Sequence, residues 1–254
     1  MFQSVYDYPF LSSSANHIFD ISVGTAAASS LSVTTAAQST KKDNIYNQMA
    51  QVLMGYDASG ATLSFDEDGD ISGGGTKLDE VFFLNFSRLL VKDEIQKGTF
   101  ELVLDAATGH TASAQPFTDR IKVSDISGSS GFFVNSPAGE YGILFANTDS
   151  GTTPLIVGEA SVGTRTGLPP CGLVFYQAGV VVLSGSVFNA STDQTTATGG
   201  LFTSGHVSSG TGVDLVASAS GSGFDFITAS TNDEIADAIR HRLFNVQFLS
   251  LIHI

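Results

Sequence analysis

Charge is scarce in this sequence, and most of it has one sign. Asp, Glu, Lys and Arg make up 14% of the 254 residues, against roughly 25% in typical soluble domains. The 11 basic residues are outnumbered by 25 acidic residues, which gives a formal net charge of −14. A chain this acidic is repelled by nucleic-acid phosphates and by anionic membrane surfaces, so we expect neither as a partner.

The residue sets that hold metals, cofactors or catalytic nucleophiles are also missing. The one cysteine, Cys171, excludes an intrachain disulfide and precedes an apolar run, so we expect a buried, inert thiol. The sequence has no phosphate-binding glycine loop, no G-x-S-x-G elbow and no paired Cys/His ligands. The five histidines lie far apart, at His17, His110, His206, His241 and His253. We therefore expect no cofactor, no metal site and no catalytic residue.

Long hydrophobic runs are absent as well. The first ten residues, MFQSVYDYPF, contain neither the basic region nor the long apolar region of a signal peptide. Apolar stretches such as Val180 to Leu183 are too short to span a bilayer. The expectation is a soluble protein that is made and assembled in a cytoplasm.

What the sequence does contain is alternation of apolar and polar residues between many turns. His17 to Val23, Thr99 to Leu104 and Glu140 to Ala146 alternate with the period of a strand. Gln177-Ala178-Gly179 is expected to be the turn of a hairpin. These patterns predict an α+β fold that is β-rich, with short antiparallel strands.

Two helices are predicted, at about residues 42–54 and 232–243. The first has one apolar stripe made of Ile45, Met49, Val52 and Leu53, and Gly55 ends it. The second starts at a capping box in which Thr231 and Glu234 satisfy each other's backbone amides. Its buried stripe is expected to include Leu243.

A cluster of charge interrupts the segment FFLNFSRLLVKDEIQKGTFELVL. Its charged residues are Arg88, Lys92, Asp93, Glu94 and Lys97. Turns are polar because their backbone groups need water or side-chain partners. We therefore interpret residues 92–98 as a connection between a strand ending near residue 90 and a strand starting near residue 99, with a catalytic carboxylate cluster as the alternative.

The segment DEDGDISGGG is the best candidate for a cation site. Asp66, Asp68 and Asp70 have the 1-3-5 spacing of an EF-hand loop, which also needs Gly at position six and Glu at position twelve. Ile71 and Lys77 occupy those two positions. A solvated acidic turn is the favoured interpretation, and a weak calcium contact is the alternative.

Four stretches, NHIFDISVG, KKDNIYNQMAQVLMGYD, FFLNFSRLLVKDEIQKGTFELVL and GLVFYQAGVVVLSG, together resemble a family of virion structural proteins from large tailed bacteriophages, especially marine ones with contractile tails. The resemblance implies a non-enzymatic subunit of the virion, tail or baseplate rather than capsid shell, assembled in the host cytoplasm. Its partners would be other virion subunits, in a homo- or hetero-oligomer.

The resemblance also bears on the extent of the domain. Residues 1–248 are expected to form one β-rich domain or two closely packed subdomains, at about 1–110 and 111–248. Family members generally continue past the equivalent of Phe248, whereas the ending LSLIHI resembles translated sequencing adaptor. We therefore expect a truncated fragment in which residues 249–254 are a non-native tail and the β segment starting at Asn245 lacks its partners.

Two other function classes remain open. A tail-associated polysaccharide hydrolase would need two carboxylates facing each other across a groove. A bacterial surface adhesin would share the acidic, Ser/Thr/Gly-rich composition, but the absent signal peptide counts against it.

Overall fold

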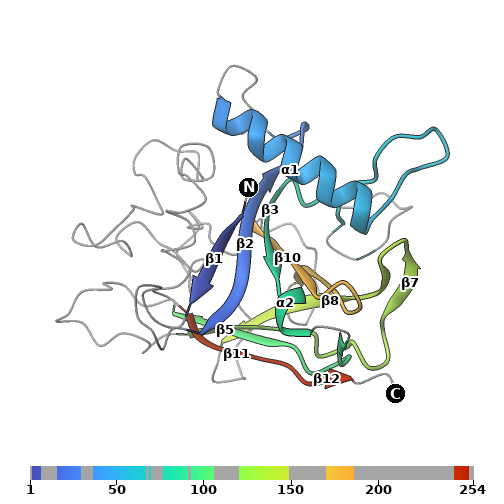
Figure 1. The fold of residues 1–254 in the computed structure, drawn as a ribbon. Coiled ribbons are helices and arrows are strands. Elements are labelled where there is room, and N and C mark those ends of the chain that lie inside the picture. Colours follow the sequence, from blue (N-terminus) through green and yellow to red (C-terminus); the bar gives the residue numbers. More distant parts are fainter. Residues whose placement is uncertain are drawn as a thin grey trace, which may run out of the picture.

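The computed structural model describes residues 2–6, 16–29, 37–66, 69, 77–90, 93–105, 120–148, 170–185 and 243–251. These residues form a curled antiparallel sheet with one long helix packed against it (Figure 1). The predicted β-rich α+β fold is confirmed at this level. The second predicted helix lies outside the described residues apart from Leu243, which begins a strand instead.

Among the described residues, the main sheet has ten strands and contains segments from both halves of the chain. Nine of them follow the order β1-β2-β3-β10-β9-β8-β6-β5-β11, and β7 pairs with β8 beside this path. The strands are β1 (Gln3–Tyr6), β2 (His17–Thr25), β3 (Glu80–Asn85), β5 (Glu101–Asp105), β6 (Arg120–Ser124), β7 (Phe133–Ser136), β8 (Gly139–Thr148), β9 (Pro170–Phe175), β10 (Val180–Ser184) and β11 (Leu243–Gln247). Two short strands, β4 (Glu94–Ile95) and β12 (Ser250–Leu251), form a separate pair.

The central strands β3, β9 and β10 are covered on both faces. Phe82 and Leu84 join an inner core enclosed by the curl of the sheet, whereas Phe83 joins a second core under the helix. Every residue of β9 and β10 is buried, including Cys171. Burial on both faces explains why these strands are continuously apolar rather than alternating.

Helix α1 (Ala37–Leu53) covers the second core and ends as predicted. Tyr46, Ala50 and Leu53 are buried against the sheet. Gly55 has φ +83°, a left-handed conformation that glycine adopts without strain, and its amide bonds to the Ala50 carbonyl at 3.0 Å. One detail of the predicted stripe is wrong, because Val52 faces solvent with 64% of its surface exposed.

The chain between β3 and β5 differs from the prediction. Strand β3 ends at Asn85 rather than near residue 90, because the Asn85 side-chain oxygen accepts a hydrogen bond from the Ser87 amide at 2.9 Å and turns the chain. The turn leads into a four-residue helix, α2 (Ser87–Leu90), and then into β4. The connection therefore contains a short helix and a short strand in addition to turns.

The expectation that the last β segment lacks partners is wrong for residues 243–251. Strand β11 pairs antiparallel with β5, and β12 pairs antiparallel with β4. Phe248 packs against Phe86 and Phe100, with ring centroids 5.5 Å and 6.5 Å away. This part of the chain therefore closes the inner core.

Candidate functional sites

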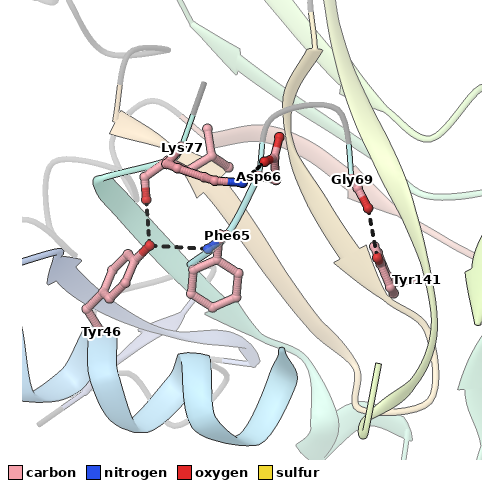
Figure 2. Close-up of polar contacts among 7 residues, drawn as sticks. Tyr46, Phe65, Asp66, Gly69, Lys77 and Tyr141 are labelled. Carbon is pink, nitrogen blue, oxygen red and sulfur yellow. Dashed lines mark hydrogen bonds and ion pairs between the residues drawn. The ribbon is translucent and has the colours of Figure 1, made fainter. Parts of the chain in front are cut away.

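The acidic loop found in the sequence is closed by an ion pair in the structure. Asp66 and Lys77 form an isolated antiparallel bridge, and the Lys77 ammonium contacts the Asp66 carboxylate (Figure 2). Asp66 is fully buried, whereas the Lys77 side chain is one-third exposed. Asp68, Asp70 and Ile71 lie outside the described residues. Lys77 stands at the position where a calcium loop would supply its last carboxylate, so an internal cation already neutralises Asp66.

Two buried tyrosines fasten this loop to the rest of the fold (Figure 2). The Tyr46 hydroxyl donates to the Leu78 carbonyl at 2.9 Å and accepts from the Phe65 amide at 3.2 Å. Burial raises the pKa of Tyr46 to about 12, so the hydroxyl keeps its proton at neutral pH. The Tyr141 hydroxyl lies 2.9 Å from the Gly69 carbonyl. We call Tyr46, Asp66, Lys77 and Tyr141 the loop junction.

The charged segment around β4 forms part of a second polar cluster. Glu94 is buried in β4, and Lys97 forms an ion pair with Glu140 at the start of β8. The Lys97 ammonium also lies 4.5 Å from the centroid of the Phe132 ring, within the range of a cation–π contact. Because both members of the ion pair are partly exposed, it contributes about 1 kcal/mol or less.

Asp125, at the end of β6, ties this segment to the sheet. Its two carboxylate oxygens accept hydrogen bonds from the backbone amides of Gly98 at 2.7 Å and Phe100 at 2.9 Å. Burial raises the pKa of the Asp125 carboxyl, although hydrogen bonds from Gly98 and other donors act in the opposite direction. The carboxylate thus satisfies two amides that the turn at Gly98 leaves without strand partners.

Tyr176, in the turn between β9 and β10, completes the cluster. Burial, followed by the charge of the nearby Asp125, raises the pKa of its phenol. The hydroxyl has no well-aligned hydrogen bond and sits in a notch between two glycines. A methyl group added at Gly142 would lie 2.1 Å from the hydroxyl oxygen, and one added at Gly128 would lie 2.4 Å from it. We call Lys97, Asp125, Glu140 and Tyr176 the connector junction.

Most of the acidic side chains described so far are paired with structural partners and show no catalytic arrangement. Asp66 is paired with Lys77, Glu140 with Lys97, and Asp125 with two amides. Asp125 is 1% exposed, so a polysaccharide cannot reach its carboxylate in this conformation. Asp20 likewise contacts Ser4 and His17. Within the described ranges, no group of three His, Cys, Asp or Glu side chains is placed to hold a metal ion.

Of the residues that the sequence singled out, Asp66 and Lys77 lie in the loop junction and Lys97 lies in the connector junction. Asp93 and Glu94 belong to neither junction; Glu94 is buried in β4. The structure does not bring the acidic loop and the charged segment into one site. Sequence reasoning missed Asp125 and Tyr176, since neither belongs to a motif. In the part of the chain that the structure describes, no helix is long and apolar enough to cross a membrane.

Comparisons with known proteins add no assignment. The sequence matches no protein-family model, and the chain matches no curated protein and no solved structure.

Proposed function

We propose that this chain is a non-enzymatic structural subunit of a tailed-bacteriophage virion, associated with the tail or baseplate. The observation that carries the proposal is the sequence resemblance of four stretches to such virion proteins. In the fold these stretches correspond to β2, α1, the segment from β3 to β5, and the β9–β10 hairpin. They make up much of the sheet and its helix, so the resemblance concerns the scaffold of the molecule.

The side-chain chemistry is consistent with this role. The buried carboxylates of the two junctions hold loops onto the sheet. The net charge of −14 disfavours direct contact with the packaged nucleic acid. Its partners would be other virion subunits, in a homo- or hetero-oligomer assembled in the host cytoplasm.

The test is to map tryptic peptides of this chain to purified capsid, tail and baseplate fractions of the particle. We expect them in the tail or baseplate fraction. Peptides found only in the soluble part of the lysate would contradict the proposal. The purified chain should also release no reducing sugar from host polysaccharide, whereas a hydrolase would.

A further inference from the structure

The outer face of α1 carries a row of side-chain amides. Asn44, Asn47, Gln48 and Gln51 follow the i, i+3, i+4, i+7 spacing that places residues on one helix face. All four are exposed, and none of their side chains has a hydrogen bond or ion pair to the described chain. We call these four residues the amide stripe.

The amide stripe continues into exposed apolar surface, and the exposed charged residues Lys41 and Asp57 flank this stretch. Val52 and Tyr56 follow it with 64% and 58% of their surface exposed. Every exposed residue from Asn44 to Tyr56 is uncharged, in a chain whose net charge is −14. Two copies of so acidic a chain repel each other over most of their surfaces, and a neutral face reduces that cost.

An amide is also self-complementary, because it donates through nitrogen and accepts through oxygen. A two-fold contact requires a surface that matches itself, since the same residues meet from both sides. A row of carboxylates or of ammonium groups fails this requirement, whereas a row of amides meets it. Figure 1 shows α1 on the outside of the molecule, with one side against the sheet and the other facing away.

We propose that the amide stripe is a contact between two copies of this chain, with the two α1 helices antiparallel across a two-fold axis. This inference rests on the proposed function, which it deepens by naming one surface and its partner. The face from Asn44 to Val52 is only about 12 Å long. It therefore covers much less than the roughly 800 Å² that each partner buries in a stable interface. The contact should be weak between isolated chains and stronger where other contacts hold the copies together.

Disulfide trapping can detect so weak a contact. The single native cysteine, Cys171, is fully buried, so an introduced cysteine is the one accessible thiol. We expect Asn47→Cys or Gln48→Cys, near the centre of the stripe, to form covalent dimers under mild oxidation. Gln96→Cys is the matched control, because Gln96 is also exposed but directly follows β4, the partner of β12. Figure 1 shows β12 at the bottom of the view and α1 at the top.

A charge change then tests the chemistry of the contact. Gln48→Glu with Gln51→Glu keeps the side-chain shapes but places like charges on both copies. We expect dimer formation by Asn47→Cys to fall about tenfold, which corresponds to about 1.4 kcal/mol. Gln96→Glu in the same background should leave it unchanged.

Absence of dimers from both stripe cysteines would overturn the inference. So would equal dimer formation by Gln96→Cys, or insensitivity to the Glu substitutions. If trapping succeeds but the chain is missing from particle fractions, the self-contact stands and the proposed function fails.

Discussion

The loop junction and the connector junction stabilise a buried carboxylate in different ways. In the first, the charge of Asp66 meets the opposite charge of Lys77, eleven residues along the chain. In the second, Asp125 meets two neutral backbone amides and a tyrosine that is itself buried. In the loop junction, the stability of the buried carboxylate depends on one cationic side chain, that of Lys77. In the connector junction it depends on several groups from segments that come together only when the chain folds.

Removal of Lys77 should have the largest effect, because it takes the opposite charge away from a fully buried carboxylate. We expect Lys77→Met to lower the free energy of unfolding by about 2–4 kcal/mol. This cost is smaller than for a fully buried ion pair, because the Lys77 side chain is one-third exposed. Urea denaturation at neutral pH measures the loss.

The matched control is the double variant Asp66→Asn with Lys77→Met, which removes both charges. It should be more stable than Lys77→Met alone. Equal stability of the two variants would show that Asp66 does not carry an uncompensated charge in the single variant.

Removal of the Asp125 charge should have a smaller effect that depends on pH. Asn presents one oxygen to two amides, so Asp125→Asn should cost about 1–3 kcal/mol. Burial raises the pKa of the Asp125 carboxyl in the folded state, so folding takes up a proton between the ordinary and the raised pKa. The contribution of Asp125 to stability therefore rises as pH falls through the raised pKa, and declines as pH rises through it.

Denaturation of the wild type and of Asp125→Asn from neutral to acidic pH separates this contribution from other groups. The cost of the substitution should grow on acidification. A cost that instead shrinks as pH falls would mean that the two amides lower the pKa more than burial raises it.

The glycine notch around Tyr176 should give the smallest effect and the sharpest test of geometry. We expect Gly142→Ala to cost about 1–2 kcal/mol, because its methyl group would meet the phenol oxygen. Tyr176→Phe removes that oxygen and should recover part of the loss in the double variant. A double-mutant cycle measures the coupling between the two positions. If the two costs simply add, the hydroxyl does not occupy the notch.

The same contrast explains what could be predicted from the sequence. The alternation in β2, β5 and β8, the turn at Gly179 and the end of α1 near Gly55 depend on neighbouring residues, and the structure has them where they were predicted. The acidic loop has a sequence signature because Asp66, Asp68 and Asp70 recur at every second residue. Asp125 and Tyr176 gave no signal, since their partners lie on other strands. The partners of β11 and β12 were missed for the same reason.

The position of Val52 shows another limit of sequence patterns. An apolar residue adjacent to a buried one was assigned to the core, yet the helix turns it to solvent beside the amide stripe. Val52 lies on the same face of α1 as the exposed, uncharged residues of the amide stripe.

The central claim is that the chain is a structural subunit, and its copy number in the particle tests that claim most directly. Quantitative mass spectrometry of purified, salt-washed particles would measure the chain relative to the major capsid protein. The account predicts several copies per particle that resist the salt wash. A chain present at less than one copy per particle, or removed by the wash, would contradict it.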